Sequence, residues 1–289
     1  MTPTLVRQHQ AHADSTPRVD RYARARDWSE IQERMLVPLY EAVYQRLEVG
    51  PATRLLGLRC GSGLALLLAA SRGATAVTGA DPSPERLALA RERLLPEGPR
   101  DPRGTRARTA VRLLQGPAGD PADPEPARYT LVTVFEPIGC RAGDTEGLGG
   151  LLAEALPAAA PGAAVVLAGW GPPERCATSS VLRVAGKLAD PLRGADSWRP
   201  ARRDDLEEVA QRAGLRPDGS GRVACPFGYA DADSAVRGLL STGLFDAAIA
   251  ATDAKQVDKE LTEALHPYRR PDGTVWMDNV FRYVIARVP

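Results

Sequence analysis

The fold of this chain is decided by the stretch RLLGLRCGSG, residues 54–63, which runs directly into the apolar segment LALLLAA, residues 64–70. The pattern predicts a short strand, a tight glycine turn and a buried helix, in that order. A second apolar strand, residues 76–80, ends on Asp81. This order is typical of a nucleotide-binding βαβ unit, in which glycines let backbone N–H groups approach a ligand and an acid holds a ribose.

The same stretch resembles motif I of the class I S-adenosylmethionine (SAM)-dependent methyltransferases, where an acidic residue precedes G-x-G-x-G. Gly61 and Gly63 match the second and third glycines, and Asp81 matches the ribose-binding acid. The resemblance extends from about Trp28 to the C-terminus. It implies a SAM site formed by Gly61, Ser62, Gly63 and Asp81. It also implies an α/β fold, a Rossmann-like seven-stranded sheet with helices on both faces. The last strand is expected to run antiparallel between strands five and six, below a small helical cap at about residues 227–271.

Two residues depart from that motif at the turn. Gly57 stands at the acidic position, and Arg59 replaces the first glycine. Without an acid at position 57 the ammonium group of SAM lacks a partner, which costs about 1.5–3 kcal/mol, or one to two decades of affinity. The Arg59 side chain has three options: it swings out, binds an anionic ligand, or fills the SAM pocket.

Two further departures follow. Pro117 stands where many relatives place an Asp near the adenine, although Asp120 or Asp123 can substitute if the loop is shifted. The strand-four signature F-D-x-V is changed as well, with Thr130 at the Asp position.

Other candidate site residues are less specific. Glu136 follows strand four and either acts at the substrate end, for instance as a general base, or is a solvated acid that caps the next turn. Trp28, Trp170 and Tyr229 are candidates for the substrate cavity; packing is the alternative for Trp28 and Trp170, and Tyr229 belongs to the expected cap. For Tyr40 we expect ordinary helix-to-sheet packing.

The chain has 289 residues, enough for one α/β domain with appendages. Its 37 Lys and Arg balance 36 Asp and Glu, so nothing indicates a nucleic-acid partner. The four cysteines form no C-x-x-C pair, which predicts reduced thiols of a cytoplasmic protein and no metal site. No apolar run reaches the ~20 residues that span a bilayer, so no membrane association is expected.

Residues 1–26 are polar and basic, and we expect a flexible arm ahead of a domain at 27–289. Asp27 is the expected N-cap of the first helix, which Pro38 should split or kink. A surface linker is expected at residues 96–108, and a long final strand at 274–288.

Two functions compete. The first is a SAM-dependent methyltransferase for a small organic molecule. The second is a pseudoenzyme, a non-catalytic relative that has lost SAM and serves as a binding or regulatory protein. A weaker third option is another nucleotide or an anionic ligand bound through Arg59. Whether the chain is an active enzyme, and whether it forms a homodimer, stay open at this point.

Overall fold

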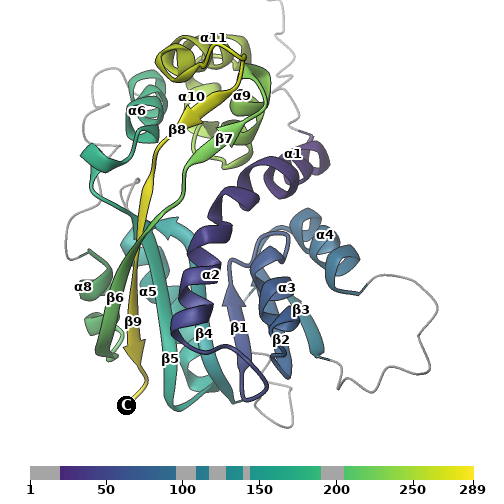
Figure 1. Cartoon of the computed structure of the whole chain (residues 1–289), viewed down its shortest axis with the longest axis vertical. Helices are drawn as coiled ribbons and strands as arrows, with labels where there is room; N and C mark the ends of the chain where they lie inside the picture. The colour runs from purple at the N-terminus through teal and green to yellow at the C-terminus, as the bar shows by residue number, and fades with distance from the viewer. Residues whose placement is uncertain (1–19, 96–108, 117–127, 139–143, 190–204) are drawn as a thin grey trace, which may run out of the picture.

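The computed structural model describes residues 20–95, 109–116, 128–138, 144–189 and 205–289. It contains a seven-stranded sheet with the order β3-β2-β1-β4-β5-β9-β6 (Figure 1). Its strands are β1 (Arg54–Leu58), β2 (Ala76–Asp81), β3 (Ala110–Gln115), β4 (Tyr129–Ile138), β5 (Ala159–Trp170), β6 (Arg216–Ala224) and β9 (Val280–Arg287). β9 lies antiparallel between β5 and β6, whereas the strands from β3 to β5 pair in parallel. The predicted sheet is therefore confirmed, including its reversed last strand.

β1 lies at the centre of the parallel part of the sheet, between β2 and β4. Leu55, Leu56 and Leu58 are all buried, as a continuous apolar run requires when both faces of a strand are covered. Because parallel strands end at the same edge, the turn after β1 lies beside the end of β2 at the carboxyl edge of the sheet.

Helices cover both faces of the sheet (Figure 1). α2 (Val37–Arg46), α3 (Leu64–Ser71) and α4 (Pro84–Leu94) lie on one face; α5 (Asp144–Ala155) and α8 (Asp205–Arg212) lie on the other. α4 begins at a side-chain cap that its sequence favours: the Ser83 hydroxyl accepts the Arg86 N–H, and Pro84 is the first helical residue. These helices fix where the turns at the sheet edge point.

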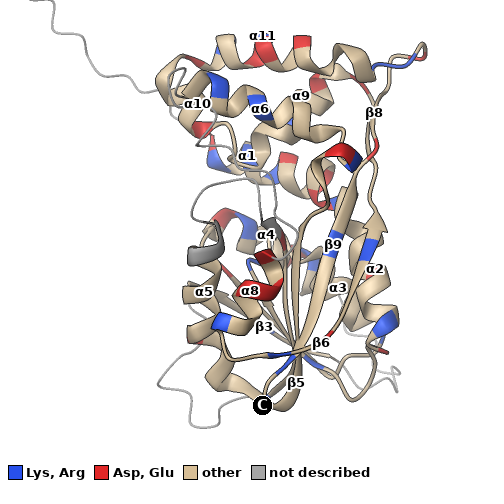
Figure 2. Ribbon diagram, turned by 90° about the vertical axis from the view of Figure 1, so that its left-hand side faces the viewer, with Lys and Arg blue, Asp and Glu red and all other residues tan. Residues whose placement is uncertain are grey.

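A helical cap lies over the carboxyl edge, at the top of Figures 1 and 2. It contains α6 (Thr178–Ala189), α9 (Ala232–Ser241), α10 (Asp246–Ala251), α11 (Ala254–Leu265) and the two-stranded sheet of β7 (Phe227–Tyr229) and β8 (Val275–Met277). The cap is broader than residues 227–271, because α6 packs on α10 and α11. The predicted long final strand is divided into β8, which belongs to the cap, and β9. The described residues also contain the short 3₁₀ turns η3 (Leu156–Ala158), η4 (Pro173–Arg175) and η5 (His266–Tyr268).

The expectation of a flexible arm is wrong for residues 21–26, which belong to the helix α1 (Arg21–Asp27). Asp20 caps this helix by accepting the Tyr22 and Ala23 N–H groups. Arg24 bonds to Asp246 of α10 at 2.8 Å, so tertiary contacts order a stretch that has no apolar period of its own. Asp27 stands directly before the helical turn that begins at Trp28, as predicted for an N-cap, but it is also the last residue of α1. Its side chain forms no capping hydrogen bond and pairs instead with Arg237 of α9. Residues 1–19 lie outside the described part.

Between α1 and α2 the helix is irregular. η1 (Trp28–Gln32) is a π-helical turn and η2 (Glu33–Leu36) is a 3₁₀ turn. Pro38 lies in the first turn of α2, so the predicted break is confirmed; proline has no N–H to continue the earlier helix.

Several expectations fall outside the described residues, namely the linker 96–108 and the positions Pro117, Asp120 and Asp123. In the part of the chain that the structure describes, no helix has the length and apolarity to cross a membrane. The same residues contain no group of three or more metal-ligating side chains.

Candidate functional site

The turn after β1 has the backbone conformation that the motif predicts. Arg59, Gly61 and Gly63 have φ angles of 50°, 59° and 77°. Arg59 therefore adopts the left-handed conformation that suits the glycine it replaces, at a cost of roughly 1–2 kcal/mol. The Gly63 N–H donates to the Cys60 carbonyl at 3.0 Å. A Cβ at position 63 would lie 3.0 Å from Ala90, so this glycine allows α3 and α4 to pack closely.

Asp81 holds the turn from the end of β2. Its carboxylate accepts the Gly61 N–H at 2.8 Å and the Ser83 N–H at 2.9 Å. The side chain is buried, and this desolvation raises the pKa of Asp81. An acid thus stands in the expected ribose position, with both of its oxygens already bound to backbone groups.

Gly57, at the position where the motif has an acid, lies beneath α3. A Cβ there would be 2.9 Å from Cδ2 of Leu66, so an Asp side chain at this position requires Leu66 to move. An acidic side chain at position 57 would therefore not fit unless Leu66 of α3 shifted.

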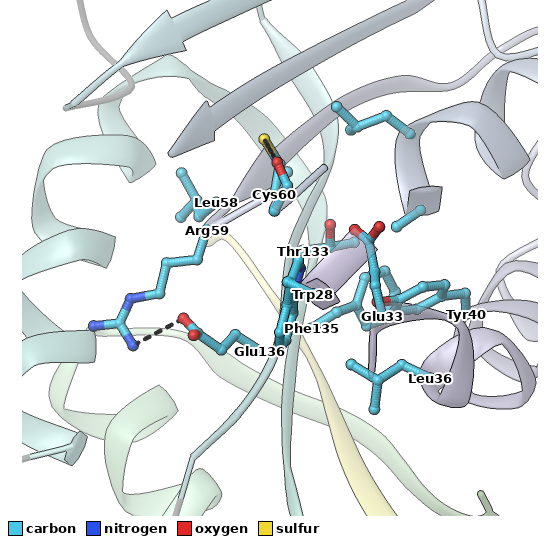
Figure 3. A pocket seen from close by; sticks show the side chains of 14 residues that line it. Trp28, Glu33, Leu36, Tyr40, Leu58, Arg59, Cys60, Thr133, Phe135 and Glu136 are labelled. Carbon is cyan, nitrogen blue, oxygen red and sulfur yellow. Dashed lines mark hydrogen bonds and ion pairs between the residues drawn. The ribbon is translucent and has the colours of Figure 1, made fainter. Parts of the chain in front are cut away.

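Arg59 takes the first of its three options and swings out. Its guanidinium forms an ion pair with Glu136 at the end of β4, with 3.6 Å between Nη1 and Oε2 (Figure 3). Its Nη2 also lies 3.6 Å from the Cβ position of Gly147 in α5. Both charged side chains are 31% exposed, so the pair is worth no more than about 1 kcal/mol. Glu136 is thus the partner of the motif's unusual cation.

Two side chains from the irregular helix lie directly over Gly61. A Cβ built at position 61 would be 2.8 Å from Nε1 of Trp28 and 3.0 Å from Oε1 of Glu33. The indole is buried, and the Arg86 guanidinium lies 4.3 Å from its ring centre, a cation–π contact. Nε1 of Trp28 has no hydrogen-bond partner among the described residues.

Glu33 is the centre of a buried polar network. Its carboxylate accepts from the Ser62 hydroxyl, from Nη1 of Arg93 at 2.8 Å and from the Leu64 N–H at 3.4 Å. Arg93 also donates to the Ser62 carbonyl and to the Ser29 hydroxyl, both at 2.8 Å. The side chain of Glu33 is 2% exposed, and this desolvation raises its pKa, against the lowering effects of Ser62 and Arg93. The network therefore binds the carboxylate to the turn.

A cavity of about 20 Å³ remains between these side chains (Figure 3). Tyr40 and Phe135 line it and pack on each other, with ring centres 4.8 Å apart. Such a volume holds about one water, whereas pockets for cofactors and drug-sized ligands measure about 300–1,000 Å³. In this arrangement the residues over the turn do not fit SAM.

Two residues expected at a substrate cavity, Trp170 and Tyr229, pack away from the glycine turn. Trp170 packs on Phe281 and Phe227, with ring centres 4.6 and 5.8 Å apart. Tyr229 is buried, and its hydroxyl donates to the Gln32 side chain at 2.9 Å. Neither lines the cavity at the turn, whereas Trp28 and Glu136 do.

A second hollow of about 650 Å³ lies away from the turn, between η4, α6 and the start of β9. Some of its polar side chains bond within the chain: the Tyr268 hydroxyl contacts Ser180 at 2.7 Å, and Asn279 accepts the Thr178 N–H. It shares no lining residue with the cavity over Gly61.

Three residues of the buried polar network, namely Glu33, Arg93 and Ser29, were not identified from the sequence. A signal existed for two of them: positions 29, 33, 36 and 40 follow the i, i+4, i+7, i+11 spacing of one helix face, which Leu36 and Tyr40 mark as buried. A charge on such a face needs a buried partner. The sequence alone does not point to Arg93 as that partner.

No protein-family model matches this chain, and no curated protein matches it in sequence. Similar solved structures exist, and three of them share 16–21% sequence identity with this chain. A putative methyltransferase from Bacillus halodurans has a TM-score of 0.52 at 16% identity, covering 86% of this chain and 98% of that one. The YcgJ protein from Bacillus subtilis has a TM-score of 0.53 at 16% identity, and the match covers 86% of this chain and 97% of that one. A putative type II methyltransferase from Anaeromyxobacter dehalogenans has a TM-score of 0.50 at 21% identity, and the match covers 86% of this chain and 94% of that one. With its strand order, this likeness shows that the chain has the class I methyltransferase fold.

Proposed function

We propose that this chain is a SAM-dependent methyltransferase-type protein that acts on a small organic molecule. The observation that supports this most is the glycine turn at residues 59–63, which Asp81 holds at the carboxyl edge of the sheet. Open α/β sheets bind their ligands outside that edge. The helical cap over the same edge favours a small acceptor over a protein or a duplex.

Binding of SAM requires Trp28 and Glu33 to move away from Gly61, because they leave no room for it. The π and 3₁₀ turns of residues 28–36 support such a movement, since mid-helix irregularities of this kind often mark functional hinges. Methyl transfer depends largely on proximity and orientation, so the engagement of Glu136 with Arg59 does not count against activity.

A non-catalytic binding or regulatory protein is the second candidate, and one observation favours it. The backbone N–H groups of Gly61, Gly63 and Leu64 all bond within the chain, so these donors of the turn are satisfied without a ligand.

For either candidate we also propose a cytoplasmic location, which the free thiols of Cys60, Cys176 and Cys225 favour.

Calorimetric titration with SAM and S-adenosylhomocysteine tests the two candidates. The proteins are the wild type, Trp28→Ala and the control Trp276→Ala, whose indole lies in β8 away from the turn. Saturation by the wild type, or by Trp28→Ala with a silent wild type, supports the methyltransferase. No heat from either of these two proteins contradicts it and supports the non-catalytic candidate.

A further inference from the structure

The groups that bind Glu33 form an arrangement suited to any carboxylate. Leu64 is the first residue of the eight-residue helix α3, and its N–H points at Oε1 of Glu33. The Arg93 guanidinium and the Ser62 hydroxyl complete the set of donors. A helix N-terminus with an arginine beside it favours negative charge and gives strong, charge-assisted hydrogen bonds.

We propose that Leu64 N–H, Ser62 and Arg93 form a binding site for the carboxylate of an amino-acid-bearing ligand, and that Glu33 is its internal occupant. An incoming ligand exchanges its carboxylate for that of Glu33. The identity of the ligand, SAM or its product, depends on the proposed function; the carboxylate site itself does not.

A second observation points to a ligand at this place. Trp28 is 6% exposed, it lines the cavity beside Glu33, and its Nε1 has no acceptor among the described residues. A buried donor left without a partner is rare in folded proteins. A polar ligand that displaces Glu33 would also bring acceptors to this indole.

The exchange needs only a short segment to move. Glu33 begins the 3₁₀ turn η2, and Trp28 and Ser29 begin the π turn η1. Arg93 bonds to both Glu33 and Ser29, so the same guanidinium that would bind a ligand also holds this segment down. Loss of the contact between Arg93 and Glu33 therefore frees the carboxylate-binding groups and at the same time weakens the attachment of the η1–η2 segment that covers them.

Rescue by a small carboxylate tests the site without any cofactor. Glu33→Ala removes the occupant, and thermal unfolding is followed in sodium propionate and in sodium chloride of equal ionic strength. We expect propionate to raise the Tm of Glu33→Ala by about 2–4 °C relative to chloride. The wild type should not respond, nor should the control Glu41→Ala, which removes a half-exposed carboxylate on α2. Equal Tm values for Glu33→Ala in the two salts overturn the proposal.

A second measurement tests the exchange. S-adenosylhomocysteine carries the amino-acid end, whereas 5′-methylthioadenosine keeps the nucleoside and lacks that end. Glu33→Gln, which preserves the shape of the side chain, and Glu33→Ala should bind S-adenosylhomocysteine roughly ten- to a hundredfold more tightly than the wild type does. Binding of 5′-methylthioadenosine should change little, and adding Arg93→Met should remove the gain.

The outcomes separate the two ideas. If propionate stabilises Glu33→Ala but no variant binds either nucleoside, the carboxylate site stands and the proposed function fails. If the gain is equal for both nucleosides, the exchange is wrong. Should Glu33→Ala not fold, Glu33→Gln carries the comparison of the two nucleosides.

Discussion

Two ion pairs flank the glycine turn, one on each side. Arg59 and Glu136 lie toward α5 with 3.6 Å between their charged atoms, and both are partly open to solvent. Arg93 and Glu33 lie toward α4 at 2.8 Å, with Glu33 almost fully buried. The motif draws attention to Arg59, because it replaces a glycine. In the structure, however, it is the Glu33 carboxylate and Trp28 that cover Gly61, whereas the Arg59 guanidinium extends toward α5 and pairs with Glu136.

The difference teaches that a substituted motif position does not by itself identify the charge that controls a cleft. An exposed pair is screened by water and contributes little, whereas a buried charge depends on its partner. We therefore expect the two pairs to respond very differently to mutation.

The largest effect should come from Arg93→Met, which leaves the Glu33 carboxylate buried without its cation. We expect a loss of about 3–5 kcal/mol in the free energy of unfolding, measured by urea denaturation. The matched control is Arg72→Met, which breaks the half-exposed pair with Glu41 and should cost no more than about 1 kcal/mol. Similar losses for the two variants would remove the distinction between buried and exposed pairs.

A second effect should appear in the pH dependence of stability. Burial raises the pKa of Glu33 above its ordinary value of 4.5, so the folded protein binds this proton more tightly than the unfolded chain does. Its stabilising contribution is therefore full below pH 4.5 and is lost as the pH rises through the folded pKa. Urea denaturation across this window should show a smaller decline for Glu33→Gln than for the wild type. Asp81 contributes in the same direction in both proteins.

The control for this pH series is Glu41→Gln, which removes a carboxylate that is 42% exposed. Its decline should match that of the wild type. A Glu33→Gln profile parallel to the wild type would mean that Glu33 titrates alike in the folded and unfolded states.

The smallest effect should come from Arg59→Gly. The variant loses a partly exposed ion pair, worth at most about 1 kcal/mol, but relieves a left-handed backbone that costs roughly 1–2 kcal/mol. The net change in unfolding free energy should therefore be a gain of between zero and about 2 kcal/mol. Arg59→Ala loses the pair without that relief, so it should be less stable than Arg59→Gly.

The same two variants should leave the affinity for S-adenosylhomocysteine unchanged, because the Arg59 guanidinium pairs with Glu136, away from the Glu33 carboxylate that lies over Gly61 (Figure 3). A tenfold gain for Arg59→Gly would show that the cation at the motif position, and not Glu33, limits ligand binding.

The sequence by itself determined the elements around the turn. The apolar run of β1, the left-handed glycines, the position of Asp81 at the end of β2 and the Ser83 cap of α4 all follow from local rules, because strand, turn and cap each depend on residues close together in the chain. The sheet order followed from the resemblance that these elements carry, and the structure confirms it.

Only the tertiary structure decided what lies over the turn. Glu33 and Trp28 reach Gly61 because the irregular segment between α1 and α2 docks on the carboxyl edge, and α1 itself is ordered by contacts with α4, α9 and α10. Such contacts join segments far apart in the chain, and their geometry is set by packing rather than by any local pattern. The side on which Arg59 leaves the turn was decided in the same way, by the position of Glu136 at the end of a neighbouring strand.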